Sequence, residues 1–385
     1  MRKKILTKGN LVYETRLKIL VLESMISFIF LVIIFLFGSC DKQKHNDAEY
    51  IFVTLNDNVI DASTFIKDAS VIKLETNDDC LIQRISKIQY FDSKLFILDI
   101  AINSVLIFNE DGSFYKKLSK AGQGPGEYIQ LIDFIIKDNF LYVMDFASQS
   151  ILKYDMDFHF LEKYKYKTFG SQLVRKDSIF WLYNEPSYQK NDYQFTCLNE
   201  KDVTLNQFLQ RKNLSDKFNW GDANVFAILN NNLYASPKYN SIFYHEINNN
   251  FVPVYEIRFN KNNFPKNENI NDYDILSPTF NYTLKWNFFV SNKYLIFDYI
   301  YNGDRRHCFY NLKNKETNFG VVKNNIIKEF FFFPRWGNED YLFQEVASHH
   351  VKENFIFLSN YNEKIKEIQD DDNPVIIMYF LNNNL

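Results

Sequence analysis

The segment Leu95-Phe-Ile-Leu-Asp99, followed by Ser104-Val-Leu-Ile-Phe-Asn109, decides the fold of this chain because it recurs. It returns 46 residues later as Leu141-Tyr-Val-Met-Asp145, followed by Ser150-Ile-Leu-Lys-Tyr-Asp155. Each copy contains two runs of β-branched and aromatic residues separated by a polar turn, a pattern typical of two strands in a hairpin. A period in the forties with several short strands per unit predicts the blades of a β-propeller.

Weaker copies of this unit continue along the rest of the chain. They lie at Ser178–Tyr183, Asn232–Ala235 with Ser241–Tyr244, Lys293–Asp298 with His307–Asn311, and Asn354–Leu358 with Pro374–Tyr379. Six units in total predict an all-β fold, a six-bladed β-propeller; two separate domains are the alternative.

Two further strands are expected before the first complete unit, near Tyr50–Leu55 and Val71–Leu74. We expect them to complete the last blade, because a strand from the other end of the chain closes the ring and removes an exposed sheet edge.

Composition supports a β fold and argues against one class of partner. Aromatic residues make up 18% of the chain, with 39 Phe and 25 Tyr. The formal net charge is −3, from 44 basic and 47 acidic residues that are interspersed along the sequence. Binding to nucleic acid relies on a concentrated basic surface, so nucleic acid is not an expected partner.

The N-terminus carries the pattern of an export signal. Basic residues among the first 18 positions precede an apolar run, Ile26–Gly38, which ends just before Cys40 and becomes polar at Asp41. This order predicts a secretory signal, and the run is shorter than the roughly 20 residues that a membrane-spanning helix needs. The small residues before Cys40 resemble the lipobox of bacterial lipoproteins. That resemblance implies that the Cys40 thiol is acylated and becomes the mature N-terminus.

The expected organisation is therefore a lipoprotein signal peptide at residues 1–39, a lipid-bearing Cys40 with a short tether at 40–49, and the propeller at 50–385. Acyl chains would hold the protein to a membrane without a spanning helix. We expect the cell envelope as its location, in the outer membrane rather than the inner one, facing the periplasm or the cell surface. An uncleaved signal anchor and a start at Met25 are the alternatives.

A glycine-rich motif, Lys120-Ala-Gly122-Gln-Gly124-Pro125-Gly126-Glu-Tyr128, joins the first two units. Pro125 follows the second glycine and no Lys-Ser/Thr pair comes after, so the motif does not match a phosphate-binding loop. We interpret Gly122, Gly124, Pro125 and Gly126 as a structural turn between blades, in which glycine permits a positive φ.

This motif resembles the turn that joins the blades of NHL-type propellers. Together with the lipobox, Leu74-Glu75-Thr76 and Asn373-Pro374-Val375, it makes the chain similar to the six-bladed propeller lipoproteins of Bacteroides-type bacteria. The resemblance covers about residues 50 to 382, and it implies a fold and a location without an established chemistry.

Several polar residues are candidates for a metal site. Asp99, Asp145 and Asp298 end equivalent strands, where they would form either a ring that suits Ca²⁺ or the hydrogen-bond acceptors of their own turns. His349 and His350 are expected to lie on a strand, where neighbours point to opposite faces and cannot chelate one ion. We therefore predict no metal site and no cofactor, with Ca²⁺ as the one ion that the aspartates would suit.

The cysteines other than Cys40 are Cys80, Cys197 and Cys308. Their odd number and wide spacing do not match a disulfide framework, so we expect them to be buried thiols. No sequence motif of an enzyme is present, and we predict no catalytic residue.

Arg335 and Trp336, with Trp286 and Arg305, are the predicted ligand-binding residues. Arginine and tryptophan anchor sugars, peptides and proteins through stacking and forked hydrogen bonds. The expected function is a binding module for a glycan, a peptide or an envelope protein, acting as a monomer. The alternative is a cation-dependent lyase or hydrolase, because the propeller families that the chain resembles include such enzymes.

Overall fold

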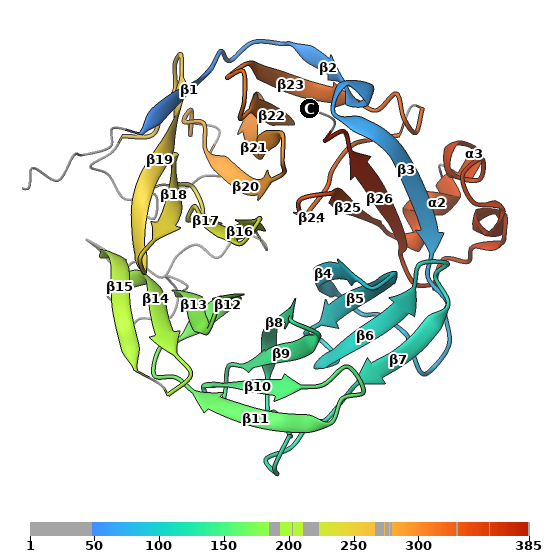
Figure 1. Cartoon of the computed structure of the whole chain (residues 1–385). Helices are drawn as coiled ribbons and strands as arrows, with labels where there is room; N and C mark the ends of the chain where they lie inside the picture. Colours follow the sequence, from blue (N-terminus) through green and yellow to red (C-terminus); the bar gives the residue numbers. More distant parts are fainter. Residues whose placement is uncertain are drawn as a thin grey trace, which may run out of the picture. The chain divides into compact units, whose positions relative to one another are not determined.

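Short strands joined by tight polar turns make up most of the described chain. The computed structural model describes residues 48–383, except 185–192, 202, 211–222, 266–272, 274–276, 278, 329 and 354. The strands form six sheets arranged in a ring about a central axis (Figure 1). The predicted six-bladed β-propeller is thereby confirmed.

Each blade has four antiparallel strands, numbered outward from the axis. Blades one to three are β4 (Ile85–Phe91), β5 (Lys94–Asp99), β6 (Ser104–Asn109) and β7 (Phe114–Leu118); β8 (Leu131–Lys137), β9 (Phe140–Asp145), β10 (Ser150–Tyr154) and β11 (Phe160–Lys165); and β12 (Gly170–Lys176), β13 (Ile179–Asn184), β14 (Tyr193–Asn199) and β15 (Thr204–Gln210).

Blades four to six follow the same order. They are β16 (Phe226–Leu229), β17 (Asn232–Ala235), β18 (Ile242–Ile247) and β19 (Asn250–Phe259); β20 (Lys285–Val290), β21 (Tyr294–Tyr301), β22 (Asp304–Asn311) and β23 (Thr317–Lys323); and β24 (Trp336–Gly337), β25 (Tyr341–Val346), β26 (Val375–Leu381) and β3 (Ile66–Lys73). We call the end of the ring where the inner strands begin its upper face, and the end where they finish its lower face.

The early strands divide between three blades. Strand β3 pairs with β26 and is the outermost strand of blade six, so the ring is closed by the N-terminal side of the chain as expected. The expectation for Tyr50–Leu55 was wrong: β1 (Glu49–Val53) pairs in parallel with β19 of blade four. Strand β2 (Val59–Asp61) pairs in parallel with β23 of blade five. An extended N-terminal segment can cover the outer edges of two blades because each edge offers unpaired backbone groups.

Blade six also departs from the expected strand pattern. The second strand of this blade is β25, whereas the predicted strand at 354–358 overlaps helix α3 (Phe355–Leu358). Helix α2 (Ser348–Glu353), α3 and a 3-10 helix (Glu363–Glu367) form an insertion between β25 and β26. A shorter 3-10 helix, Ala62–Thr64, precedes β3.

The insertion is helical because its apolar residues follow a helical rather than a two-residue period. Val351, Leu358 and Ile365 recur every seven residues and are all buried in one cluster. Two helical turns separate positions seven apart, so these side chains reach one side of the insertion. His349 and His350 lie in α2, and the prediction that they occupy a strand was therefore wrong.

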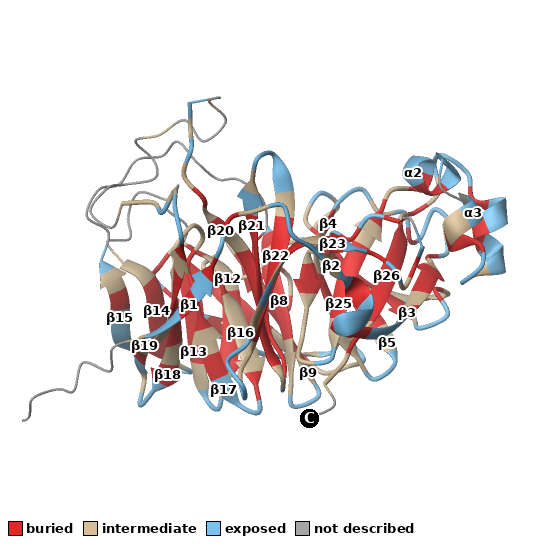
Figure 2. Ribbon diagram, turned by 90° about the horizontal axis from the view of Figure 1, so that it is seen from above, coloured by how far each residue is buried: buried red, intermediate tan, exposed pale blue. Residues whose placement is uncertain are grey.

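The core lies between the blades. Within the described residues, six clusters of buried apolar side chains occupy the six contacts between neighbouring blades. Leu95–Leu98 in β5 are all buried because alternate side chains pack against blades on opposite sides (Figure 2). A strand covered on both faces reads as a continuous apolar run, which explains the quoted repeat. Cys80, Cys197 and Cys308 are free thiols and all buried, as expected.

Tight hairpins explain part of the asparagine content. The pairs Asp92-Ser93, Asp138-Asn139, Asn230-Asn231 and Asn248-Asn249 have positive φ at both positions. Two-residue turns of this type match the twist of the flanking strands, and Asn and Asp tolerate a positive φ better than most other residues.

The glycine-rich motif lies between β7 of blade one and β8 of blade two. Gly126 has a φ of +74°, and a Cβ added there would lie 2.6 Å from the Cβ of Phe160. The Gly124 N–H donates to Glu127 Oε2 at 2.8 Å, and the buried Tyr128 hydroxyl donates to the carbonyl of Leu118 at 3.1 Å. Conformation and close packing therefore both require glycine at position 126.

Candidate functional site

Polar groups near the starts of the inner strands link each blade to the next. Lys87 Nζ of blade one contacts Asp133 Oδ1 of blade two at 2.7 Å. The other oxygen of Asp133 accepts from Leu173 N of blade three at 2.6 Å. Gln172 of blade three donates to the carbonyl of Ala223, which precedes blade four, at 2.6 Å. Burial raises the pKa of the Asp133 carboxyl, and the charge of Lys87 opposes that rise.

The same pattern completes the circuit through blades four, five and six. Asn224 N donates to Asn287 Oδ1 at 2.8 Å, and Asn287 Nδ2 donates to the carbonyl of Arg335 at 2.9 Å. Trp336 Nε1 then donates to the carbonyl of Ser86 in blade one at 3.1 Å. A closed ring of hydrogen bonds therefore ties together the inner edges of all six blades.

Bulges at the starts of three inner strands help to aim these side chains. In β4, Ile85 pairs with Asp99 and Lys87 with Leu98, which leaves Ser86 as an extra residue. Strands β8 and β12 have register shifts at the corresponding place. A bulge bends the strand and redirects the residues that follow it, here the polar residues of the ring.

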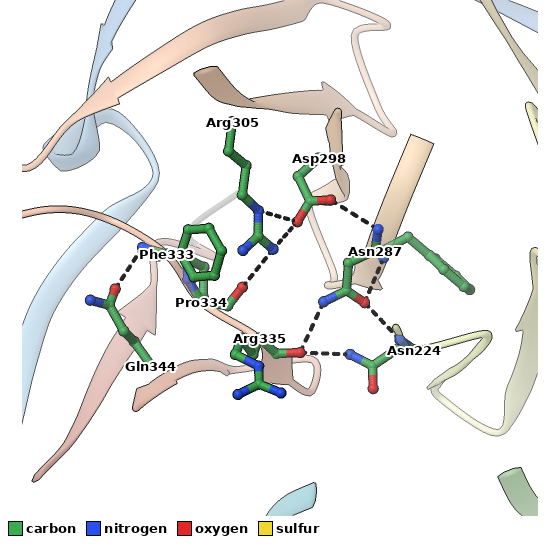
Figure 3. A network of polar contacts seen from close by, with 9 residues as sticks. Asn224, Asn287, Asp298, Arg305, Phe333, Pro334, Arg335 and Gln344 are labelled. Carbon is green, nitrogen blue, oxygen red and sulfur yellow. Dashed lines mark hydrogen bonds and ion pairs between the residues drawn. The ribbon is translucent and has the colours of Figure 1, made fainter. Parts of the chain in front are cut away.

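Beside this ring, the segment from Phe331 to Arg335 forms a rim on the upper face between blades five and six (Figure 3). The buried Gln344 of β25 holds it: Phe333 N donates to Gln344 Oε1 at 2.6 Å, and Gln344 Nε2 donates to the Phe331 carbonyl at 3.2 Å. Phe331 and Phe333 point outward and are 49% and 42% exposed. An exposed aromatic pair on a fixed backbone is a preorganised contact surface.

Arg305 of β22 stabilises this rim from blade five. Its Nε donates to Asp298 Oδ2 at 2.9 Å, and its Nη2 donates to the carbonyl of Pro334 at 3.1 Å. The guanidinium also lies 3.8 Å from the centre of the Phe333 ring. We call Phe331, Phe333, Arg305 and Arg335 the aromatic rim.

The structure brings two of the predicted contact residues together at this rim and separates the other two. Arg335 packs over Trp336 and forms an ion pair with Glu345 at 3.1 Å, with 31% of its side chain exposed. Trp336 itself is only 3% exposed, and its ring belongs to the buried contact between blades six and one. Trp286 is half-buried and meets Tyr239 edge to face.

Sequence reasoning missed the two exposed phenylalanines and the amides that hold the rim. Four consecutive Phe residues, 330–333, precede Pro334. In the structure Phe330 and Phe332 are buried while Phe331 and Phe333 are exposed. Such an alternation in an irregular segment depends on Gln344, which lies on a different strand, so no local pattern could reveal it.

The strand-end aspartates act as acceptors in their own turns. Asp99 Oδ2 accepts from the backbone N–H of Gln83 and Arg84, and its Oδ1 from Ala101 N. Asp145 accepts from the N–H groups of the corresponding positions before β8, while Asp298 contacts Arg305 and Asn287. In the part of the chain that the structure describes, no group of three or more His, Cys, Asp and Glu residues could hold a metal ion.

Two buried bases lie behind the aromatic rim. Lys285 is 2% exposed, and burial lowers its pKa to about 7, while the nearby Asp298 opposes that shift. His307 is also buried, and both of its ring nitrogens lack a hydrogen-bond partner among the described residues. Burial, together with the charge of Arg305, lowers the pKa of His307 well below its usual value. Glu345 differs in sign: burial raises its pKa, against the effect of Arg335.

The predicted lipid-attachment residue, Cys40, and the predicted signal peptide lie outside the described residues. Among the residues that are described, no helix is long and apolar enough to cross a membrane.

Comparison with known proteins gives a family match and related folds. The family model of a domain of unknown function, DUF4934, matches residues 50–380. A crystal structure of a candidate exported protein from Bacteroides fragilis has a TM-score of 0.70 and 19% identity, covering 86% of this chain and 99% of that chain. A member of the DUF4221 family from Bacteroides vulgatus has a TM-score of 0.48 and 11% identity, covering 82% of this chain and 96% of that chain. No curated protein matches the sequence.

At such low identity, the likeness to the Bacteroides fragilis structure establishes the fold alone. The family match spans the propeller from β1 to β26, the same region in which the inner ring and the aromatic rim are built. The chain therefore belongs to the DUF4934 family of domains of unknown function.

Proposed function

We propose that this protein is an exported, membrane-anchored binding module that engages a glycan, a peptide or an envelope protein with its aromatic rim. The observation that carries the proposal is a pair of exposed phenylalanines on a backbone fixed by Gln344 and Arg305. A preorganised surface loses little conformational entropy when a partner binds. Aromatic and arginine side chains are enriched among the residues that dominate binding energy.

Export and anchoring form the second part of the proposal. The signal-like N-terminus with Cys40 supports it, and the structurally similar Bacteroides fragilis protein is described as a candidate exported protein. We propose acylation at Cys40 and a place in the outer membrane, facing either the periplasm or the cell surface. The protein would act there as a monomer.

The binding role can be tested with purified full-length protein on arrays of glycans and peptides and against envelope extracts. A Phe331→Ala/Phe333→Ala double variant is expected to weaken binding at least tenfold. Tyr115→Ala is the matched control, because Tyr115 is equally exposed at 49% but lies on β7, the outer edge of blade one. A ligand that binds the double variant and wild type equally well would refute a role for the rim.

Anchoring needs a separate test. Cells that express wild type or Cys40→Ser are grown with an alkyne fatty acid and then fractionated. Wild type should incorporate the label and appear in the outer-membrane fraction, and the variant should lose both properties. An unlabelled wild type, or a labelled variant, would exclude lipid attachment at Cys40.

A further inference from the structure

A cavity lies at the lower face, at the opposite end of the inner strands from the aromatic rim. Its volume is about 110 Å³, and it lies between the inner strands of blades six, one and two. The residues that line it are Ile88, Gln89, Tyr90, Phe91, Ile136, Gly337, Asn338 and Phe343. One water needs only about 10–15 Å³ of such space, so this cavity has room for several waters or one small ring.

Two amide side chains present hydrogen-bond donors at the cavity. Gln89 Oε1 accepts from Ile136 N at 3.0 Å. Asn338 Oδ1 accepts from Asp340 N at 2.9 Å and from Tyr341 N at 2.8 Å. These bonds fix which end of each amide is the oxygen, and the NH₂ groups of Gln89 and Asn338 have no partner within the described chain.

The rest of the lining is aromatic, aliphatic or backbone. Tyr90 and Phe343 lie with ring centres 6.5 Å apart, and Phe91 is a neighbour of Tyr90 on β4. At Gly337 an added Cβ would lie 2.8 Å from the Tyr341 carbonyl oxygen and 2.9 Å from Phe289. The lining contains no Asp, Glu, Lys, Arg or His, so a charged ligand would lose its hydration without gaining a counter-ion.

We propose that this cavity binds one uncharged sugar ring, whose hydroxyl or acetamide oxygens accept hydrogen bonds from Gln89 and Asn338. A sugar ring combines an apolar face, which packs on aromatic walls, with oxygen acceptors at its edge. The two unpaired donors and the absence of charge together select this class of ligand. The proposal is independent of the aromatic rim, which lies on the upper face.

Titration calorimetry of the full-length protein in detergent tests the proposal, with N-acetylglucosamine and glucuronate as probes. N-acetylglucosamine should bind saturably, and glucuronate at least tenfold more weakly because its carboxylate would be buried without a counter-ion. No saturable binding of N-acetylglucosamine, or tighter binding of glucuronate, would overturn it.

A Gln89→Glu/Asn338→Asp double variant separates the site from general stability. Each new carboxylate keeps the oxygen that accepts the backbone hydrogen bonds, and it removes the NH₂ donors. Loss of two hydrogen bonds should weaken N-acetylglucosamine binding at least tenfold. Unchanged affinity in this variant would place the sugar elsewhere.

Two controls accompany the double variant. Asn311→Asp changes an asparagine that also accepts two backbone N–H groups in a turn, far from the cavity, and it should bind like wild type. Phe331→Ala/Phe333→Ala should also leave sugar binding unchanged. A loss of N-acetylglucosamine binding in that rim variant would show that the sugar occupies the upper face, and it would refute the cavity as its site.

Discussion

Replacing Lys285 with methionine should stabilise the protein at neutral and acidic pH. The Lys285 side chain is buried between blades four and five, where Nζ lies over the rings of Phe243 and Phe288 and contacts the Ser236 carbonyl at 3.4 Å. These contacts replace little of the hydration that an ammonium group has in water. Methionine has a similar length and no charge, so it can fill the same space without the desolvation cost.

The magnitude follows from the shift in pKa. The pKa of Lys285 falls from 10.5 to about 7 on folding. Each unit corresponds to about 1.4 kcal/mol, so the folded state loses on the order of 5 kcal/mol when the pH is well below 7. Because the pKa is depressed in the folded state, the unfolded chain binds more protons between pH 7 and 10.5, and the free energy of unfolding rises with pH in that window. Between pH 6 and pH 9 this contribution changes by about 3 kcal/mol.

Urea unfolding of wild type and Lys285→Met at pH 6, 7, 8 and 9 measures the effect. The variant should be the more stable protein at pH 6, and its advantage should shrink by about 3 kcal/mol by pH 9. Taking the difference between the two proteins removes the contributions of the other titrating groups. Lys313→Met, at an exposed turn position, is the control and should show no such trend. A difference that stays constant across this range would refute the idea that Lys285 is desolvated.

Three further predictions follow from the turns and the buried histidine. Asp145→Asn replaces an acceptor of two backbone N–H groups with a donor and should lower the free energy of unfolding by about 2–3 kcal/mol, while Ca²⁺ or EDTA leaves the melting temperature unchanged; a Ca²⁺-dependent shift would restore the metal interpretation. Gly126→Ala should cost about 2–4 kcal/mol by urea unfolding, because it combines a strained φ with a contact to Phe160; Gly303→Ala, with a φ of +81° and nothing within 4 Å, isolates the strain and should cost about 1–2 kcal/mol. Equal losses would mean that packing at Gly126 is unimportant. His307→Phe should flatten the loss of stability as the pH falls below about 6.5, since the depressed pKa of the buried imidazole makes wild type less stable there; parallel acid unfolding curves would contradict this.

The repeated strands were predictable because burial on both faces produces a local signal. A run such as Leu95–Leu98 shows its state in its own composition, so the second and third strands of the blades could be located. The inner strands were harder to locate, since they carry bulges and polar residues that interrupt the apolar pattern. The short helices of blade six were missed because Phe355–Leu358 also reads as an apolar strand of ordinary length.

The candidate site was only partly predictable for a related reason. Arg305 and Arg335 were chosen by residue type, and both lie at the aromatic rim. Trp336 was chosen on the same grounds, yet it is buried because its indole N–H meets a carbonyl of blade one. Whether an aromatic residue anchors a ligand or fills a contact between blades depends on what lies opposite, which residue type does not encode.

The sequence alone determined the repeat length, the number of blades and the lack of a basic surface, because strand periodicity and charge are properties of neighbouring positions. It also carries the export signal and Cys40, which a receptor or enzyme reads as linear motifs. Only the tertiary structure decided the parallel pairing of β1 and β2, the closed ring of hydrogen bonds and the positions of the rim and the lower cavity. These features join residues from different blades, such as Asn287 with Arg335, and hydrogen bonds between distant segments exist only after the ring has closed.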